Sequence, residues 1–338
     1  MSITKLYLKN FTVFDRLNIE FSKGINVFIG DNGTGKTHIM KLLYSACQAA
    51  QAKTTAIDFS QKIVRVFRPD DLSLHRLVKR SVGSSNTVIK VSSGRHTLSL
   101  EFNSKHTRNI IIKGNETWEN QFADLTSTFI PAKEILSNSR NLIQAIDKGN
   151  VDFDDTYKDI ISAASVDISR GAESATKKKF LNSLQEITTG TVRVKNEEFY
   201  LKPGTQSLLE FQLVAEGIRK IALLWQLIKN GTLESGSILF WDEPEANINP
   251  KNIPAIVDML LNLKSDGVQI FIATHDYFFA KYLQVRKVSK NDVLFHALYR
   301  NDDIVEHESE NDFSLLENNS IISQSIELYK EEVKKVME

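Results

Sequence analysis

Three short apolar runs along the chain predict buried β-strands. They cover residues 25–29, 238–241 and 268–273. A polar stretch follows each run at once: a glycine-rich loop after the first, two carboxylates after the second and a histidine after the third. Ligands bind at the carboxyl edge of open parallel sheets. We therefore expect these three strands to share one sheet, with their polar ends at the same edge.

Strand patterns also dominate residues 3–21 and 60–115. Alternating apolar positions over residues 3–21 predict two strands joined near Asn10–Asp15. A run at residues 63–67, stopped by Pro69, predicts another strand. Further strands are predicted at residues 87–91, 97–102 and 109–112, separated by turns rich in Ser, Asn and Gly. We expect an antiparallel meander inserted between the first helix and the rest of the core.

The second half of the chain alternates helices with hairpins. A strand near residues 129–130 leads into helical spacing over residues 143–187, which Gly190 ends. Hairpins are predicted for residues 191–202 and 293–306. Helices are predicted for residues 211–227, 253–263 and 321–336, the last one amphipathic.

Composition narrows the class of protein. Hydrophobic residues make up 41% of 338 and charged residues 25%, as in an ordinary soluble protein. Lys+Arg and Asp+Glu both number 42, so bulk charge does not favour coating nucleic acid or acidic membranes. The single cysteine, Cys47, excludes an internal disulfide framework, and we expect it to pack in the core. No apolar run approaches the roughly 20 residues of a membrane helix, so we expect no membrane partner and a cytoplasmic location.

The strand at residues 25–29 runs directly into a complete phosphate-loop motif. Gly30–Thr37 matches G-x-x-x-x-G-K-S/T, and helical spacing begins after it. Glycines let backbone N–H groups converge on an anion, and the helix N-terminus adds its dipole. Lys36 is expected to reach the β- and γ-phosphates of ATP, and the Thr37 hydroxyl to ligate Mg²⁺. The predicted nucleotide-binding residues are Asn32, Gly33, Thr34, Gly35, Lys36, Thr37 and His38. A glycine turn with a chance lysine is the alternative, which the flanking strand and helix disfavour.

The other two buried strands end in groups that phosphoryl transfer requires. Asp242 is expected to hold Mg²⁺, directly or through water, and Glu243 to orient or deprotonate the attacking water. His275 is placed to donate to the γ-phosphate. The catalytic residues we predict are therefore Glu243, His275 and Lys36. A helix N-cap role for the two acids, and a purely structural role for the histidine, are the alternatives.

These motifs together resemble those of ABC-type ATPases of the RecF/SMC/OLD class, in the group of stand-alone ATPases labelled AAA-type. The resemblance rests on residues 6–11 with 24–33, on 240–250 and on 272–276. It implies an α/β P-loop NTPase head with a parallel core sheet, an antiparallel β lobe and an inserted helical lobe. Residues 1–130 would form the first ATPase lobe. Residues 131–230 would form the helical lobe, and 231–338 the second part of the core with the C-terminal hairpin and helix.

The resemblance also implies a signature loop that meets ATP bound on a partner subunit. Residues 213–220 lie in the matching place, with Gly217 expected to contact that ATP in trans. Ala215 stands where the class usually has serine, and one such hydrogen bond contributes about 1–3 kcal/mol. A plain amphipathic helix is the alternative here. The usual glutamine after the β lobe is not evident, and whether Lys133 or Glu134 replaces it stays open.

The implied function is a Mg²⁺-dependent ATPase whose two heads sandwich two ATPs, as a homodimer or a higher oligomer. Relatives of this class fuse to effector domains or sit beside them. This chain would then regulate a separate effector, such as a nuclease, in prokaryotic genome or anti-phage defence. One alternative is a RecF-like repair ATPase that binds DNA, for which Arg76, Lys79 and Arg80, or Lys177, Lys178 and Lys179, are basic strips. Such strips are more often solvated faces. Another alternative, favoured by Ala215, is an ATP-binding scaffold with low turnover.

Overall fold

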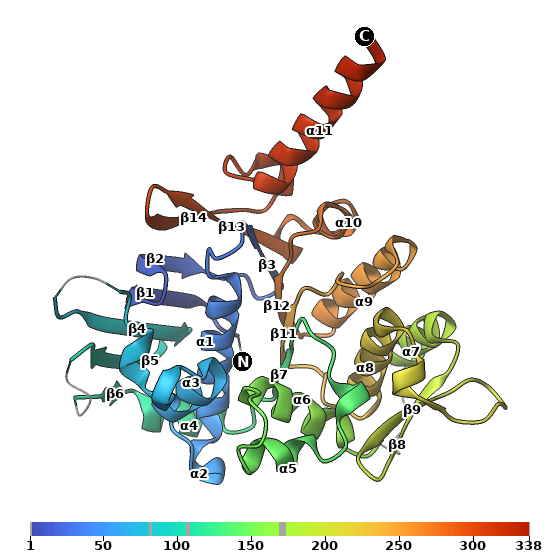
Figure 1. Cartoon of the computed structure of the whole chain (residues 1–338), viewed down its shortest axis with the longest axis horizontal. Helices are drawn as coiled ribbons and strands as arrows, with labels where there is room; N and C mark the ends of the chain where they lie inside the picture. Colours follow the sequence, from blue (N-terminus) through green and yellow to red (C-terminus); the bar gives the residue numbers. More distant parts are fainter. Residues whose placement is uncertain (1, 81–82, 106–108, 169–173, 338) are drawn as a thin grey trace.

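The computed structural model describes residues 2–80, 83–105, 109–168 and 174–337 (Figure 1). Two sheets enclose the first long helix, α1, and further helices cover the outer face of the larger sheet. A third, small sheet belongs to the helical part of the chain. This arrangement is the α/β head with a parallel-containing core sheet, a β lobe and a helical lobe that the sequence predicted.

The core sheet has the strand order β14-β13-β3-β12-β11-β7. Every neighbouring pair is parallel except β13 with β14. Its strands are β3 (Ile25–Gly30), β7 (Ser127–Ile130), β11 (Ile238–Asp242), β12 (Gln269–Ala273), β13 (Val293–Asn301) and β14 (Ile304–Glu310). The three strands that the apolar runs predicted therefore lie side by side in one sheet. The predicted C-terminal hairpin extends this sheet through β13, which pairs with β3.

Both faces of the core sheet are buried, and alternate side chains serve different cores. Phe28, Phe240 and Phe271 face α1 and the second sheet, and Phe240 stacks on Phe271 with ring centroids 5.0 Å apart. The residues next to them, such as Trp241 and Ile272, face the helices on the other side. Successive strand residues point to opposite faces, so a continuous apolar run is what a doubly covered strand requires.

The second sheet is antiparallel, with the order β2-β1-β4-β5-β6. Its strands are β1 (Lys5–Phe11), β2 (Phe14–Glu20), β4 (Asn86–Ser93), β5 (His96–Asn103) and β6 (Ile111–Lys113). The predicted N-terminal strand pair and the later meander are thus parts of one sheet. Helices α1 (Lys36–Gln48), α4 (Asn115–Phe122), the short α2 (Ala52–Thr55) and α3 (Phe59–Phe67) accompany it. Cys47 is a buried free cysteine on α1, as expected.

The strand predicted at residues 63–67 is wrong, because this run is the end of helix α3 (Phe59–Phe67). Asp58 caps the helix in a capping box with Gln61, which satisfies backbone N–H groups at its N-terminus. Phe59, Ile63 and Val66 are the buried apolar positions, at the four- and three-residue spacing of one helical face. Short apolar runs suit a strand or a helix equally, so the cap upstream of the run is the informative feature.

The helical lobe follows β7. It consists of α5 (Leu142–Asp147), α6 (Asp155–Ser165), α7 (Ala175–Thr188), β8 (Thr191–Lys195), β9 (Glu198–Lys202), β10 (Leu209–Glu210) and α8 (Glu216–Lys229). The helix predicted from residue 211 begins only at Glu216, because residues 211–213 form a separate 3-10 turn. Helices α8, α9 (Ile253–Ser265) and α10 (Tyr277–Arg286) contribute to the core on the outer face of the large sheet.

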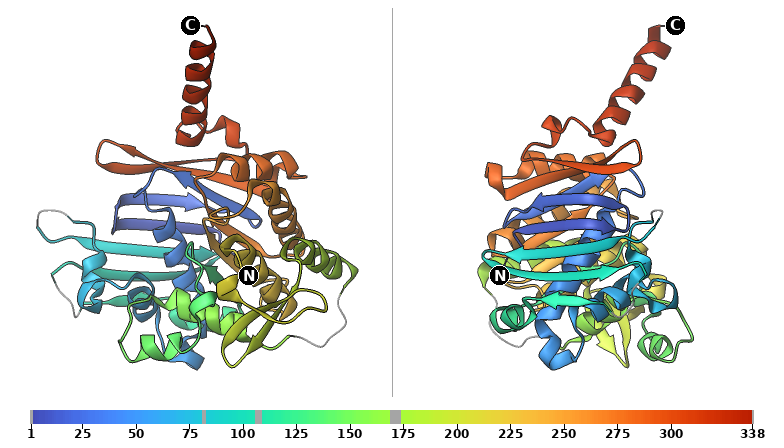
Figure 2. Two further views of the ribbon diagram at one scale, coloured as in Figure 1. Left: turned by 45° about the vertical axis from the view of Figure 1, so that its right-hand side comes forward. Right: turned by 90° about the vertical axis from the view of Figure 1, so that its left-hand side faces the viewer.

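The last helix, α11 (Ser320–Met337), projects away from the body of the protein (Figure 2). It has no buried residue, although its sequence is amphipathic as predicted. No helix built from the described residues combines the length and the apolar character needed to span a bilayer.

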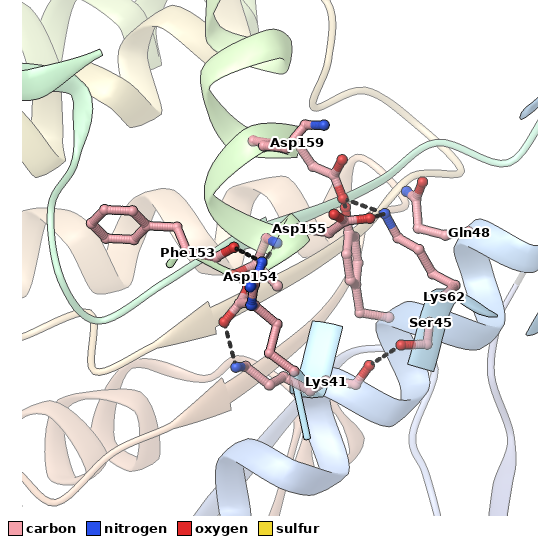
Figure 3. A network of polar contacts seen from close by, with 12 residues as sticks. Lys41, Ser45, Gln48, Lys62, Phe153, Asp154, Asp155 and Asp159 are labelled. Carbon is pink, nitrogen blue, oxygen red and sulfur yellow. Dashed lines mark hydrogen bonds and ion pairs between the residues drawn. The ribbon is translucent and has the colours of Figure 1, made fainter. Parts of the chain in front are cut away.

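Ion pairs join helices α1 and α3, which pack with the antiparallel sheet, to the start of α6 in the helical lobe (Figure 3). The ammonium of Lys41 on α1 lies 2.6 Å from the Asp154 carboxylate. The ammonium of Lys62 on α3 lies 3.0 Å from Asp155 and 2.7 Å from Asp159, and the Lys62 side chain is 6% exposed. A run of acidic side chains at one helix N-terminus thus meets two lysines from the other lobe. These contacts link the helical lobe to the helix that begins at the phosphate loop.

The ion pairs of Lys62 generate a stability prediction. Lys62→Ala leaves two partly buried carboxylates, Asp155 and Asp159, without their cation, so it should lower the free energy of unfolding by about 1–3 kcal/mol. The matched control is Lys5→Ala, whose pair with Glu20 is exposed and should contribute less than about 1 kcal/mol. Urea unfolding of the two variants measures both effects. Equal losses in the two variants would contradict a special role for the inter-lobe pairs.

Candidate active site

The phosphate loop connects β3 to α1 and depends on glycine at two positions. Gly30 has φ +133°, and a Cβ there would lie 1.9 Å from the Leu298 carbonyl oxygen on β13. Gly35 has φ +93° and is the N-cap of α1. A glycine has no side chain that could cap the helix, so the first N–H groups of α1 are available to an anion. Thr34 is buried, and its hydroxyl donates to the Asp31 carbonyl over 2.8 Å, which stabilises the loop itself.

Lys36 is the buried cation of the loop. Its ammonium donates to the carbonyl oxygens of Gly30 and Asp31 at 2.8 and 2.9 Å. Burial lowers the pKa of Lys36 to about 8, against the opposing effect of nearby Asp242, Asp31 and Glu243. The side chain is therefore mostly charged near neutral pH. A buried, partly desolvated ammonium interacts more strongly with phosphate than an exposed one does.

Thr37 and Asp242 meet across the sheet edge. The Thr37 hydroxyl donates to Asp242 Oδ2 over 2.9 Å, although the two residues are far apart in the chain. Burial raises the pKa of Asp242 to about 6, partly offset by this hydrogen bond. A hydroxyl and a carboxylate oxygen in contact are ligands of the kind that Mg²⁺ prefers, with waters and phosphate oxygens completing its octahedron. The two residues therefore fit the group that a phosphate loop implies.

Glu243 follows Asp242 in an uncommon backbone conformation. Its φ is 47°, in the left-handed region, which costs a non-glycine residue on the order of 1–3 kcal/mol. Its N–H donates to the Ala273 carbonyl over 2.9 Å, so the loop stays joined to β12 beyond the end of β11. Such strain is common at active sites, where surrounding contacts hold a side chain in one direction.

His275 lies just beyond β12, where a buried carboxylate holds the backbone. Glu245 Oε1 accepts from the Thr274 hydroxyl at 2.7 Å and from the His275 N–H at 3.2 Å. Burial raises the pKa of Glu245 to about 7. Burial of the ring, and then the Lys36 charge, lower the pKa of His275, so its imidazole is neutral at pH 7. A neutral imidazole can donate one hydrogen bond and accept another.

One cavity of ≈ 260 Å³ gathers most of the predicted residues. It is lined by Val13, Asn32, Gly33, Gly35, Lys36, Thr37, His38, Asp242, Glu243, Ala273 and His275. Thr34 and Gly217, also predicted to bind nucleotide, are outside this lining. Thr34 supports the loop instead, and the role of Gly217 at ATP on a second chain stays a prediction. The carboxyl ends of β3, β11 and β12 thus meet around a single space.

The signature-like loop precedes α8. Ala215 is the N-cap of this helix and provides no side-chain cap, and it is exposed. Gly217 is buried against the loop after β11, where a Cβ would lie 2.3 Å from the Asn247 carbonyl oxygen. The glycine is therefore needed for helix-to-loop packing within one chain.

The loop after β7, where the class usually has a glutamine, contains a buried ion pair. Arg219 Nε lies 2.6 Å from Glu134 Oε2, with side-chain exposures of 14% and 2%. Glu134 also accepts from the N–H and the hydroxyl of Ser137. Lys133 instead lies over the Phe153 ring. Glu134 thus joins this loop to α8, and neither it nor Lys133 is among the residues that line the cavity.

The two basic strips differ in their surroundings. Arg76 lies 3.3 Å from Asp70, and Lys79 pairs with Asp15, so both cations have carboxylate partners in the same chain. On α7, Lys178 and Lys179 are exposed. Arg80, the third residue of the first strip, is exposed as well, so both strips present exposed charge that a polyanion could meet.

Two buried residues near the cavity received no role in the sequence analysis. Glu245 holds the end of β12, as described above. Lys220, in α8, is 1% exposed, and its ammonium donates to the Glu243 carbonyl over 3.4 Å. The sequence did contain a signal for Lys220, because this lysine directly precedes the apolar centre of a helix. Lysine is rarely buried unless it has a partner, so its place there was unusual.

Fold and site together define the class. A phosphate loop opens α1, and a carboxylate pair and a histidine end neighbouring strands of the same parallel sheet, as in P-loop ATPases with a RecF/SMC-type head. Residues 25–280 match the model of the family described as "AAA domain, putative AbiEii toxin, Type IV TA system". This match spans more than half of the chain, and the chain belongs to that family.

Individual relatives are similar over short segments. The chain is 34% identical to a DNA replication and repair protein RecF of Streptococcus suis over 83 residues, which is 25% of this chain and 22% of the relative. It is 43% identical to the RecF protein of Clostridium kluyveri over 58 residues, 17% of this chain and 16% of the relative. The chain thus matches less than a quarter of the length of these relatives.

Solved structures with the same fold cover nearly the whole chain. An Smc head bound to the C-terminal winged-helix domain of ScpA covers 91% of this chain and 97% of its own, with a TM-score of 0.59 and 15% identity. An Smc head with an extended coiled coil, bound to the C-terminal domain of ScpA derived from Pyrococcus furiosus, covers 98% and 99%, with a TM-score of 0.52 and 11% identity. At these identities the likeness establishes the fold alone.

Glu245 predicts a pH dependence of stability. Its pKa is about 7 in the folded chain against 4.5 as the ordinary value, so the folded state holds the extra proton between these pH values. Raising the pH from 5 to 8 should therefore cost the folded state about 1–3 kcal/mol through this group. Glu245→Gln should remove that part of the slope in urea unfolding at the two pH values. An unchanged slope would show that the carboxyl does not titrate in this range.

Replacing Ala215 with serine should stabilise the folded chain. Ala215→Ser supplies an oxygen that can accept from the free N–H groups of the first turn of α8, so the free energy of unfolding should rise by about 0.5–2 kcal/mol. Ala215→Val, which offers no acceptor, is the matched control and should give no gain. Chemical unfolding of both variants makes the comparison. A serine variant no more stable than the valine variant would mean that another group already satisfies this helix end.

Proposed function

We propose that this chain is a Mg²⁺-dependent ATPase that binds and hydrolyses ATP at a head-to-head dimer interface. We further propose that it acts as the regulatory subunit of a separate effector, such as a nuclease, in prokaryotic genome or anti-phage defence. The observation that carries the enzymatic part is the cavity in which Lys36, the Thr37–Asp242 pair, Glu243 and His275 converge. These groups come from three neighbouring strands and match what phosphoryl transfer requires.

The residues divide the work according to their chemistry. The N–H groups of the loop and of the first turn of α1 bind the phosphates, and Lys36 adds a positive charge. Glu243 orients or deprotonates the attacking water, with its direction set by the constrained backbone. His275, neutral at pH 7, donates a hydrogen bond toward the γ-phosphate position. Mg²⁺, held by Thr37 and Asp242, would supply charge neutralisation of the phosphate oxygens.

The dimer part of the proposal is supported by the position of the signature-like loop. Ala215 is exposed at the N-terminus of α8, outside the cavity of its own chain. A helix N-terminus is suited to a phosphate supplied by a second copy. Without a serine hydroxyl at residue 215, this contact is weaker by about 1–3 kcal/mol, so the ATP-bound dimer should be less stable than one with serine at this position.

The proposal of a separate effector is supported by the proteins to which this chain is similar. The description of the family refers to a toxin–antitoxin system, and the Smc heads of similar fold are bound to ScpA domains. These descriptions support the proposal that this chain also acts with a second protein. An ATP-binding scaffold with low turnover is a variant of the same proposal. In that variant the binding of ATP, and not its hydrolysis, controls the effector.

A RecF-like role at DNA is the second candidate. The local similarity to RecF proteins and the exposed lysines of α7 support it. In that case ATP-bound protein should retard duplex DNA in a salt-dependent manner, and Lys178→Glu with Lys179→Glu should remove the shift. A shift that does not change with ATP would instead indicate non-specific charge attraction.

Glu243→Gln tests the enzymatic proposal. The variant should bind ATP and Mg²⁺ like the parent chain, because the loop, Lys36 and Asp242 are untouched. Its steady-state phosphate release should fall by about 10²–10⁴-fold, since it lacks the general base. Its ATP-bound form should accumulate as a dimer in light scattering.

Glu310→Gln, at the exposed end of β14, is the matched control for loss of a carboxylate and should leave phosphate release unchanged. Lys36→Ala should abolish nucleotide binding. A Glu243→Gln variant that releases phosphate at the parent rate would show that another group activates water.

A further inference from the structure

Lys220 is a buried cation beside the proposed catalytic loop. It lies on α8, next to the apolar segment 221–225, and is 1% exposed. Burial lowers the pKa of Lys220, and the carboxylates of Glu216, Glu245, Glu243 and Glu134 oppose this effect. Removing an ammonium from water is unfavourable unless close partners compensate. A lysine in this place therefore calls for a physical explanation.

Packing needs do not explain this charge. Among the described residues, the Lys220 ammonium makes one hydrogen bond, 3.4 Å long, to the Glu243 carbonyl oxygen. No carboxylate of the residues that the structure describes lies within ion-pair distance of the Lys220 ammonium. An ammonium has three donors, so most of its bonding capacity is unused here. An apolar side chain of the same length would fill the space at lower cost.

The contact falls on a constrained part of the loop. Glu243 and Asn247 both have left-handed backbone conformations, with φ of 47° and 63°. Helix α8 touches the loop at each of these residues. Lys220 donates to the Glu243 carbonyl, and Gly217, one turn earlier, packs against the Asn247 carbonyl. The first turns of α8 thus support the loop at its two unusual residues.

Both sides of Glu243 are held by hydrogen bonds. Its N–H donates to Ala273 on β12, and its carbonyl accepts from the Ala246 N–H at 3.1 Å and from Lys220. Of these donors only Lys220 belongs to α8, the helix that begins at the signature-like loop. The direction of the Glu243 side chain follows from this backbone, so a shift of the carbonyl would turn the carboxylate.

We propose that Lys220 is a positioning residue for ATP hydrolysis, holding the Glu243 carbonyl so that the Glu243 carboxylate points at the attacking water. This inference rests on the proposed ATPase function and extends it to a residue outside the cavity. Lys220 is not among the residues that line the cavity, so it should influence the chemical step and leave binding alone.

Lys220→Met tests the inference, because methionine has a similar length and no charge. Its kcat for ATP should fall about 10–100-fold, as expected when a catalytic group is misplaced by a fraction of a bond length or more. Its KM, and its affinity for a fluorescent ATP analogue, should stay within about twofold of the parent values. Its unfolding midpoint should not decrease, since a buried charge has been replaced by an apolar group.

Lys229→Met is the matched control, at the far end of the same helix, and its kcat should stay within about twofold of the parent value. Lys220→Gln, which keeps one donor at shorter reach, should give a kcat between those of Lys220→Met and the parent. The inference is overturned if Lys220→Met turns over ATP at the parent rate. It is also overturned if both substitutions at residue 220 unfold the chain, or lower nucleotide affinity together with kcat, because Lys220 would then be structural.

Failure of the ATPase proposal gives a different pattern. In that case the parent chain releases no phosphate, or Glu243→Gln releases it normally. If instead the parent is active, Glu243→Gln is inactive and Lys220→Met is fully active, only the role of Lys220 is wrong.

Discussion

A hydrogen bond between Thr37 and Asp242 joins the first turn of α1 to the end of β11, although the two residues are 205 positions apart in the chain. It depends on the parallel pairing of β12 with both β3 and β11, which aligns the carboxyl ends of these strands. The other groups of the site lie at this same carboxyl edge of the core sheet. The phosphate loop begins at Gly30 at the end of β3, Glu243 follows β11, and His275 lies just beyond β12. The sheet is therefore the frame that converts three distant sequence segments into one set of neighbouring side chains.

The site is assembled from charges that the fold keeps out of water. Burial lowers the pKa of Lys36 and raises the pKa values of Asp242 and Glu245, which means that each charged form is held at some cost to stability. The left-handed backbone at Glu243 adds strain in the same place. A site prepared in this way needs little rearrangement when a charged ligand arrives, which is the usual reason for such arrangements in enzymes. The two large apolar cores supply the stability that makes this possible.

Helix α8 connects the parts of this arrangement. Its N-terminus begins at the signature-like loop, Lys220 and Gly217 contact the loop after β11, and Arg219 pairs with Glu134 beyond β7. In the same lobe, the carboxylates at the start of α6 pair with lysines of α1 and α3. The helical lobe thus contacts the loop that carries Glu243 through α8, and it contacts α1 and α3 through α6. Buried polar networks whose members are satisfied make a structure more rigid.

The sequence by itself determined the features that local chemistry sets. The glycine spacing at residues 30–35 and the apolar runs before Asp242 and His275 identified the loop, the strands and most residues that line the cavity, because strand burial and anion binding leave direct patterns in neighbouring residues. The local pattern gave a wrong prediction where a strand and a helix can have the same apolar run. The example is residues 63–67, where the Asp58 cap favours a helix. Only the tertiary structure decided that β13 joins the core sheet beside β3, that Glu134 binds Arg219, and that Lys220 lies beneath Glu243. Each of these is a contact between segments far apart in the chain, and its energy comes from burial that no short stretch of sequence can report.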